Sequence, residues 1–267
     1  MANTNWYKYL EKGIEAVKAG GLVLNDTSLH KMEIKEDGSP VTAADKAVEK
    51  KIRDILIPTF TECGFEGEEY ETVRPNASLR WLCDPIDGTW SFLNKENTAA
   101  TSLSLFEDGV PKLAIIYNPF TQELYTGCEG ISPTLNQKPL PRKTRINLAE
   151  GLLNFHVHAS QTDLICQIYD WWHQEKFAKV VSQGGSVAYG MAKVAEGIHS
   201  VYLGKTRKRS NLWDLGAGIF LIRSIGGKVT DRNGNDIYTS ESNQLMIACT
   251  EAAIHEEMLQ LLSELPE

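Results

Sequence analysis

The sequence predicts a fold that joins an N-terminal α+β half to a C-terminal α/β half. Strand signals dominate between residues 79 and 126, whereas strands alternate with helices beyond the Pro- and Lys-containing stretch at 133–145. The length of 267 residues suits one large domain or two intimate ones. We therefore divide the chain into residues 1–140 and 141–267, with an error of about ten residues at the boundary.

Two helices are expected before the first long strand. The apolar residues between 6 and 17 recur at helical spacing, and Gly20-Gly21 ends that pattern. A second pattern begins at Thr42-Ala43-Ala44-Asp45, which is typical of a capping box with aspartate in place of glutamate, and it runs to Pro58. Asp45 is therefore expected in the first helical turn, where a carboxylate is electrostatically favoured.

The pattern then changes to strands. Residues 79–83 predict an apolar strand, 102–106 and 112–117 predict a hairpin, and 124–126 predict a further strand. In the C-terminal half, the expected strands are 152–157, 179–181, 198–203 and 246–249, and the expected helices are 162–175, 186–196, 213–224 and 251–263.

The composition is that of an ordinary globular protein. Apolar residues make up 42% and charged residues 23%, which argues against disorder. The 27 basic and 35 acidic residues give a net charge of −8, which disfavours nucleic acid or anionic membranes as partners and suits a protein that binds cations. Since no apolar run approaches the ~18 residues of a membrane span, no membrane partner is expected.

Cysteine usage and the first residues both favour the cytoplasm. The five cysteines are odd in number and scattered, and no CxxC pair occurs, so neither a disulfide framework nor a structural zinc site is expected. Lys8, Glu11 and Lys12 occupy the place where a secretion signal needs an apolar stretch. We expect a cytoplasmic protein with reduced cysteines.

Acidic residues gather in two neighbouring segments. Residues 66–71 hold four carboxylates, which taken alone suit a solvated acidic loop. Sixteen residues after Glu68, Asp84 ends an apolar strand, and Asp87 follows in a turn closed by Gly88. Asp-Pro and Asp-Gly are common in turns, but turn chemistry does not explain two carboxylates at the mouth of a buried strand.

A divalent cation would remove the repulsion among these carboxylates. Ligands that are all oxygen suit Mg²⁺, and no His or Cys lies within residues 84–89 to favour zinc. Thr89 adds a hydroxyl, and the N–H groups of Gly88 and Thr89 could face an anion. Far downstream, Asp214 is expected at the start of a helix, where it could equally be an ordinary N-cap.

Together these segments resemble the inositol monophosphatase superfamily of Mg²⁺-dependent, lithium-sensitive phosphatases. The matching motifs, in the order of the family, are Ser39-Pro40-Val41-Thr42-Ala43-Ala44-Asp45, Gly67-Glu68-Glu69, Asp84-Pro85-Ile86-Asp87-Gly88-Thr89, and Trp213-Asp214 followed by Gly226-Gly227. The Asp-Pro-Ile-Asp-Gly-Thr block is highly specific, whereas Trp-Asp alone is weak. The resemblance implies a layered αβαβα sandwich of the sugar-phosphatase type and a homodimer.

The resemblance also implies two to three Mg²⁺ ions in each active site. Glu68, Asp84 and the Ile86 carbonyl would hold the first ion. Asp84, Asp87 and Asp214 would hold the second, and Glu68 could reach a third.

Catalysis and phosphate binding are implied for a further set of matching residues. Asp45 and Thr89 would orient and deprotonate the attacking water, beside Glu68. The amides of Gly88 and Thr89, with Gly185-Ser186, would cradle the phosphate. Phosphate-ester hydrolysis needs charge neutralisation and an in-line nucleophile, and metals ~4 Å apart can clamp both the entering and the leaving oxygen.

One segment departs from the inositol phosphatases. Leu203 occupies the place of an acidic residue that contacts ring hydroxyls in those enzymes. The loop from there to Trp213 is longer, and its residues 205–209 carry four cations. A basic cluster prefers a second phosphate or a carboxylate, so Lys205 and Arg207 are candidate substrate-binding residues, although such a run is often merely solvated.

We therefore expect a Mg²⁺-dependent phosphate monoesterase that acts on a small polyol or sugar phosphate. Residues 210–214 are also similar to 3′(2′),5′-bisphosphate nucleotidases, and Gly67-Glu68-Glu69-Tyr70 is shared with histidinol-phosphate phosphatases, so both substrates stay open. The alternative without catalysis is a regulatory protein on the same scaffold that binds RNA or a protein through residues 205–209.

Overall fold

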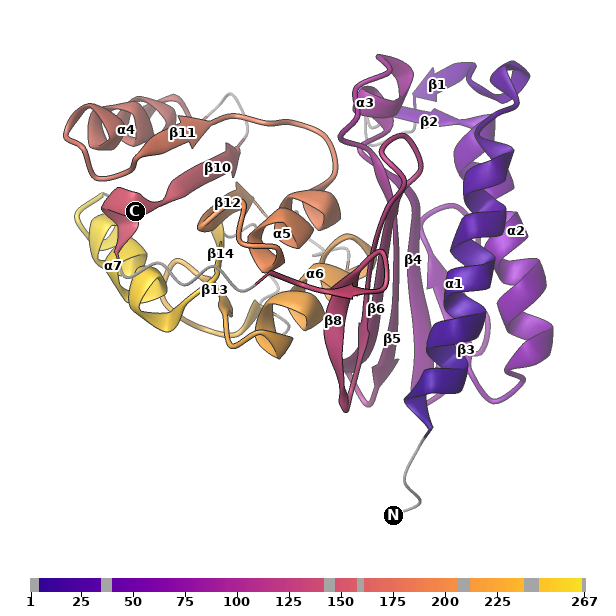
Figure 1. Cartoon of the computed structure of the whole chain (residues 1–267). Helices are drawn as coiled ribbons and strands as arrows, with labels where there is room; N and C mark the ends of the chain where they lie inside the picture. The colour runs from indigo at the N-terminus through magenta and orange to yellow at the C-terminus, as the bar shows by residue number, and fades with distance from the viewer. Residues whose placement is uncertain are drawn as a thin grey trace. The chain divides into compact units, whose positions relative to one another are not determined.

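The computed structural model describes residues 5–34, 40–141, 147–157, 161–205, 212–237 and 245–265, with only the backbone of Lys205. The chain divides into two compact units. The first comprises Met1–Pro139, Gly185–Tyr189 and Leu212–Phe220, and the second comprises Leu140–Gly184, Gly190–Asn211 and Leu221–Glu267. Each unit has its own sheet, as Figure 1 shows.

The first unit is built on a seven-stranded sheet in the order β3-β4-β5-β6-β7-β8-β9. Neighbouring strands are antiparallel except β3 and β4, which are parallel. The expected hairpin is confirmed by the pairing of β5 with β6. The strands are β3 (Gly64–Gly67), β4 (Leu79–Asp87), β5 (Ala100–Glu107), β6 (Val110–Asn118), β7 (Glu123–Cys128), β8 (Ile131–Leu135) and β9 (Lys138–Pro139).

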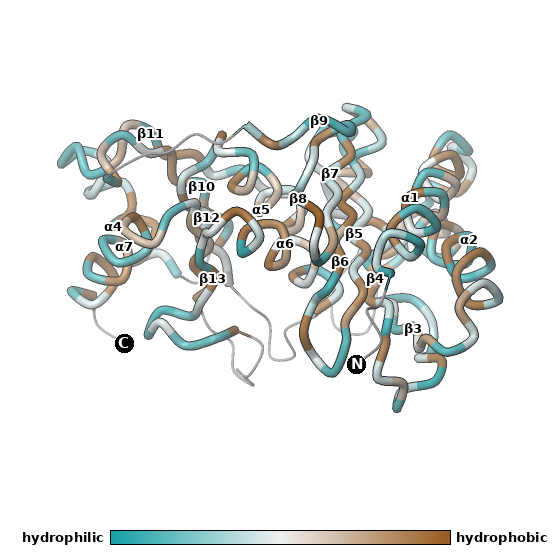
Figure 2. Tube along the Cα trace, turned by 60° about the horizontal axis from the view of Figure 1, so that its bottom comes forward, coloured by the Kyte–Doolittle hydropathy of each residue, from teal (hydrophilic) through white to brown (hydrophobic). Residues whose placement is uncertain are grey.

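Two long helices, α1 (Trp6–Val23) and α2 (Ala43–Thr59), pack on each other and on one face of this sheet (Figure 1). Hydrophobic and hydrophilic residues alternate along both helices in Figure 2, as expected for helices with one buried face. The approach is close, because a Cβ on Gly13 of α1 would lie 2.6 Å from Ile115 Cδ1. A short hairpin of β1 (Met32–Ile34) and β2 (Pro40–Thr42) precedes α2.

The opposite face of the sheet receives the first part of α6 (Leu212–Ser224). Side chains alternate along a strand, so Leu103 and Leu105 of β5 join the core under α1 and α2, whereas Ser104 and Phe106 face the other way. A Cβ on Gly216 of α6 would lie 2.6 Å from the Phe106 ring and 2.7 Å from Ser104 Oγ. Residues 212–220 therefore pack with the first unit, although they come late in the sequence.

The second unit has a five-stranded sheet in the order β11-β10-β12-β14-β13. β10 is parallel to its neighbours β11 and β12, whereas β14 is antiparallel to its neighbours β12 and β13. The strands are β10 (Leu152–His156), β11 (Lys179–Val181), β12 (Val201–Lys205), β13 (Lys228–Asp231) and β14 (Leu245–Cys249), and the other helices are α3 (Thr89–Leu93) of the first unit, α4 (Thr162–His173), α5 (Val187–Ala195) and α7 (Ala252–Ser263).

Most expected elements of the C-terminal half are present, but β12 starts at Val201 and not at 198. The N–H groups of Ile198 and His199 both donate to the Lys193 carbonyl, which closes the end of α5, so these residues are unavailable for a sheet. The short strands β1, β2, β3, β8, β9 and β13 were not expected, and β4 extends to Asp87, beyond the expected 79–83. Among the described residues, no helix combines the length and apolarity needed to span a bilayer.

Candidate active site

A bulge at the end of β4 brings Asp84 and Asp87 to the same face of the sheet. Asp84 pairs with Ser102 of β5 and Asp87 pairs with Ala100, so three steps along β4 match two steps along β5. In a regular strand, residues three apart face opposite sides, and the extra residue removes that alternation. The N–H of Ile86 donates to Asp84 Oδ1 at 2.9 Å within the bulge. Both carboxylates are buried, with 4% and 5% of their surface exposed.

Two further acidic residues reach this point from other parts of the chain. Gly67 pairs with Cys83 in the parallel ladder of β3 and β4, which carries Glu68 to the level of the bulge. Asp214 lies in the first turn of α6. The hydroxyl of Ser102 donates to the carbonyl of Trp213 at 2.7 Å, so this turn is held directly against β5.

The charges of these groups act on one another. Burial raises the pKa of Asp84 well above its ordinary value, and the negative charges of Glu68, Asp214 and Asp87 raise it further. A hydrogen bond with Asp214 acts in the same direction. Four carboxyl groups, from the residue after β3, from β4 and from α6, are therefore close enough to act on one another, and Asp84 and Asp87 among them are buried.

Asp87 is held by the start of α5. Its Oδ2 accepts hydrogen bonds from Ser186 Oγ at 2.6 Å and from the N–H of Ala188 at 2.7 Å. Burial raises the pKa of Asp87 to about 6, although these hydrogen bonds and one from the N–H of Val187 lower it. The positive end of the helix dipole also favours a carboxylate here.

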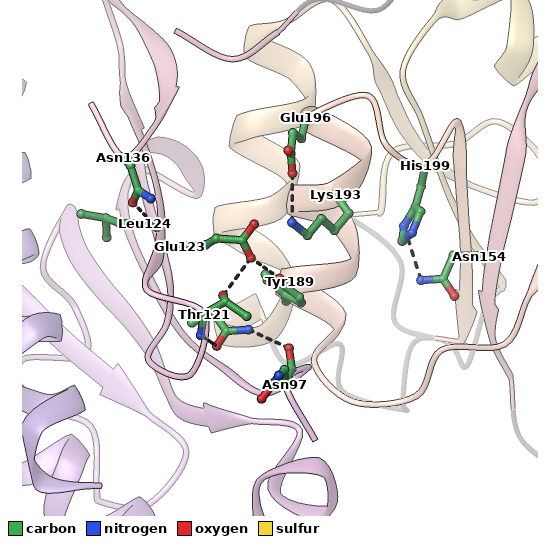
Figure 3. Close-up of polar contacts among 11 residues, drawn as sticks. Asn97, Thr121, Glu123, Leu124, Asn136, Asn154, Tyr189, Lys193, Glu196 and His199 are labelled. Atoms are coloured by element: carbon green, nitrogen blue, oxygen red, sulfur yellow. Dashed lines mark hydrogen bonds and ion pairs between the residues drawn. The ribbon is translucent and has the colours of Figure 1, made fainter. Parts of the chain in front are cut away.

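The same helix is anchored to the sheet through Tyr189. Its hydroxyl donates to the carboxylate of Glu123 on β7, which also accepts from Thr121 Oγ1 at 2.8 Å (Figure 3). The ring of Tyr189 packs edge-on against Tyr125, with 6.3 Å between the centroids. These contacts fix the first turn of α5, which in turn fixes Asp87.

A second pair of functional groups joins α2 to α3. Thr89 Oγ1 lies 3.4 Å from Asp45 Oδ1 and 3.3 Å from the Ile86 carbonyl oxygen. The other carboxylate oxygen of Asp45 accepts from the N–H and the hydroxyl of Thr42 at 2.7 and 2.6 Å, which confirms the expected capping box. Asp45 is only 1% exposed, and burial raises its pKa to about 6.

The expected phosphate cradle is made of backbones in close contact. Gly88 has φ 88°, and a Cβ there would lie 2.7 Å from Ser186 N and 2.9 Å from the Gly185 carbonyl carbon, so only glycine fits. The N–H of Ser186, however, donates to the Thr98 carbonyl at 3.0 Å, and its hydroxyl donates to Asp87. Ser186 therefore supports Asp87, and its N–H is already engaged.

The first unit thus brings together all the expected site residues that the structure describes in full, from Asp45 to Asp214. The remaining candidates are the side chain of Lys205 and the whole of Arg207, which lie outside the described residues.

The donor set suits hard divalent cations. It consists of carboxylate oxygens and the Ile86 carbonyl, and their mutual repulsion is the kind that such a cation removes. Within the described residues, no three His, Cys, Asp or Glu side chains form a complete metal cage by themselves.

Sequence reasoning assigned Ser186 to the phosphate cradle and missed its support of Asp87, and it gave no role to Ser102, Glu49 or Arg53. Ser186 carried one usable signal, because its hydroxyl accepts from the N–H of Tyr189 at 2.8 Å, as a helix cap does. Ser102 carried none, because its partner Trp213 lies 111 residues away. Glu49 and Arg53 are spaced like any exposed ion pair of a helix, although both are buried.

Comparison with known sequences gives matches along the whole chain. A model of the inositol monophosphatase family matches residues 6–267. An inositol-1-monophosphatase of Synechocystis sp. is 27% identical over 97% of this chain and 90% of its own length. A fructose-1,6-bisphosphatase/inositol-1-monophosphatase of Aquifex aeolicus is 30% identical over 85% of this chain and 86% of its own length. A 3′(2′),5′-bisphosphate nucleotidase CysQ of Buchnera aphidicola is 28% identical over 91% and 92%.

Solved structures of similar proteins have the same fold as this chain. The structure of an inositol monophosphatase from Anabaena has a TM-score of 0.82 and 25% identity, and it covers 98% of both chains. The extragenic suppressor protein suhB of Bartonella henselae gives 0.84 at 25% identity, over 95% of this chain and 98% of its own. The structure of an IMPase/NADP phosphatase complexed with Mg²⁺ and phosphate has a TM-score of 0.73 and 20% identity, and it covers 86% of this chain and 85% of its own. The likeness confirms the expected layered sandwich.

Proposed function

The chain belongs to the inositol monophosphatase family and is a phosphoric monoester hydrolase, and from that premise we propose that it hydrolyses a small polyol or sugar phosphate with bound Mg²⁺. The observation that carries the proposal is the group of Glu68, Asp84, Asp87 and Asp214, of which Asp84 and Asp87 are buried, beside the Thr89–Asp45 pair. We further propose a cytoplasmic homodimer, and the free state of all five cysteines is compatible with that compartment.

Mg²⁺ would be held by three sets of oxygens. Glu68, Asp84 and the Ile86 carbonyl are proposed for one ion, Asp84, Asp87 and Asp214 for a second, and Glu68 for a third. When bound, Mg²⁺ neutralises charge on phosphoryl oxygens and lowers the pKa of water. Residues before Pro139 supply most of these ligands, and the later segment that packs with them supplies Asp214.

The Thr89–Asp45 pair provides a route for the proton of the attacking water. The Thr89 hydroxyl faces Asp45 Oδ1, so it can pass its own proton to the carboxylate while its oxygen accepts one from water. A pKa of about 6 lets Asp45 take up a proton near neutral pH and release it again. The 3.4 Å separation is typical of such pairs before substrate tightens them.

Replacing Thr89 tests this route. Thr89→Val keeps the shape of the side chain but removes the hydroxyl, so we expect kcat to fall by about a hundred-fold or more with little change in KM. Thr89→Ser keeps the hydroxyl and should retain most of kcat. Steady-state kinetics with inositol-1-phosphate at saturating Mg²⁺ measure both. Equal kcat values for the two variants would contradict the proposed route.

Mg²⁺ should also stabilise the protein directly, since a ligand that binds only the native state raises Tm. At about a hundred times Kd, the gain is about 2.7 kcal/mol, or a Tm rise of about 5–10 °C for a chain of this size. Differential scanning fluorimetry measures it, with NaCl at equal ionic strength as control. No rise at any Mg²⁺ concentration would remove the proposed metal site.

The substrate is best identified with a panel. Inositol-1-phosphate, fructose-1,6-bisphosphate, 3′-phosphoadenosine-5′-phosphate and histidinol phosphate should be assayed with Mg²⁺, with and without Li⁺. We propose that a polyol or sugar phosphate gives the highest kcat/KM and that Li⁺ inhibits. Residues 205–209 are proposed to contact the part of the substrate away from the reacting phosphate, so preference for the nucleotide would assign them a second phosphate.

A further inference from the structure

One face of α2 carries a buried ion pair one and two turns beyond Asp45. Glu49 is fully buried, and its Oε1 accepts from Arg53 Nε at 2.7 Å. The side chain of Arg53 is 10% exposed. Because 3.6 residues make one helical turn, Asp45, Glu49 and Arg53 lie on the same side of the helix.

This ion pair holds the segment that contains Glu68. The second oxygen of Glu49, Oε2, accepts from the N–H of Glu69 at 2.7 Å. The two Nη atoms of Arg53 donate to the carbonyls of Glu71 at 3.0 Å and of Tyr70 at 3.1 Å. Three consecutive residues after Glu68 are thereby tied to α2 through their backbone.

The Glu49–Arg53 pair is also closely packed against the segment that contains Glu68. A Cβ on Gly67 would lie 2.3 Å from Glu49 Oε1, so the glycine lets the segment lie directly on this carboxylate. The guanidinium of Arg53 lies 4.7 Å from the Phe65 ring centroid and 5.5 Å from that of Tyr70. Phe65 also pairs with Val73 through two backbone hydrogen bonds, which join the two ends of the segment.

We infer that Glu49 and Arg53 act as positioning residues that set Glu68 for Mg²⁺, an inference that rests on the proposed function. The segment has no other regular structure between Gly67 and the bridge at Val73, so its path depends on the atoms that hold it. Glu68 lies between Gly67, which contacts Glu49, and Glu69, which donates to Glu49. A single helix then aligns both Asp45 and Glu68.

The neighbouring ion pair on α2 provides a matched control. Lys50 and Asp54 are also spaced four residues apart, with 2.6 Å between Nζ and Oδ2, but their side chains are 64% and 57% exposed. They line a surface pocket of about 440 Å³ together with Arg53 and Tyr70. The control therefore matches the Glu49–Arg53 pair in spacing and charge, and it differs in being exposed and in having no hydrogen bond to the described residues 69–71.

The test compares variants that remove each pair. Glu49→Gln/Arg53→Met removes both charges together, which avoids leaving one buried charge unpaired, and it abolishes the two bonds from Arg53. Glu49→Gln alone keeps the two Arg53 bonds to Tyr70 and Glu71, and in both variants the Gln side chain offers an oxygen to the N–H of Glu69. The control is Lys50→Met/Asp54→Asn. Mg²⁺ affinity is measured without substrate, from the dependence of Tm on MgCl₂, and amide exchange is measured at Glu69.

We expect the double variant to weaken Mg²⁺ binding by about 10–100-fold, the single variant to weaken it less, and the control to leave it unchanged. The Glu69 amide should exchange faster in the double variant, and saturating Mg²⁺ should restore kcat, which damage to the fold would not permit. If the wild type binds Mg²⁺ and the double variant binds it with the same affinity, the inference is overturned but the proposed function is not. A wild type that binds no Mg²⁺ overturns the proposed function and the inference with it.

Discussion

Asp87→Asn is expected to lower kcat by about a thousand-fold while the protein stays folded. A charge that stabilises the transition state through bound metal is worth several kcal/mol, and about 4 kcal/mol corresponds to this factor. The amide keeps one oxygen that can accept from Ser186 Oγ and from the N–H of Ala188, so the start of α5 remains attached. The negative charge is lost, and the second carboxylate oxygen is replaced by an NH₂ group that does not ligate Mg²⁺.

Ser186→Ala tests how much the orientation of Asp87 contributes, because the variant keeps the negative charge of Asp87. It removes the 2.6 Å hydrogen bond to Asp87 but leaves the carboxylate and its bond from Ala188. We expect a kcat loss of about tenfold, intermediate between wild type and Asp87→Asn. Steady-state kinetics at saturating Mg²⁺ measure both variants, and circular dichroism checks the fold. Asp87→Asn with activity within about tenfold of wild type would show that Asp87 is not a ligand.

The local parts of this site could be predicted from the sequence. Asp45 was placed in the first turn of a helix by the residues around it, and the structure confirms its capping box. The turn at Gly88, where φ is 88°, was also predicted, although β4 runs on to Asp87 and does not end at residue 83. In each case, the residues that determine the conformation are neighbours in the sequence.

The long-range parts could not be predicted in the same way. That Asp84 and Asp87 share a face depends on the register between β4 and β5, and one inserted residue reverses it. The amide of Ser186 donates to Thr98, 88 residues earlier in the sequence, so no local pattern indicates that it is engaged. The Glu49–Arg53 pair has the spacing of a surface pair, and only packing against Gly67 and Phe65 distinguishes it.

The second large effect concerns Asp45, whose replacement should separate activity from stability. Burial raises its pKa from 3.8 to about 6, so the folded protein binds this proton more tightly than the unfolded chain does. Stability from this group is therefore greatest below pH 3.8 and falls as the pH rises to about 6. Above that, the charged and buried carboxylate costs at most about 3 kcal/mol.

Asp45→Asn removes that cost and with it the proton acceptor of Thr89. We expect kcat to fall by about 10²–10⁴-fold, while Tm in EDTA at pH 8 rises relative to wild type. At pH 4.5 the wild-type carboxyl is largely protonated, so the difference in Tm between the two proteins should shrink. Asp54→Asn, on the exposed face of the same helix, should show neither effect.

The direction of the Tm change decides what Asp45 is for. A structural cap needs only an oxygen that accepts from Thr42, and asparagine supplies one, so a capping role alone predicts little loss of activity. A carboxylate that is retained despite its burial cost, and whose loss stabilises the protein while stopping turnover, is explained by proton transfer from Thr89. A lower Tm at pH 8 together with full activity would instead assign Asp45 to the helix start alone.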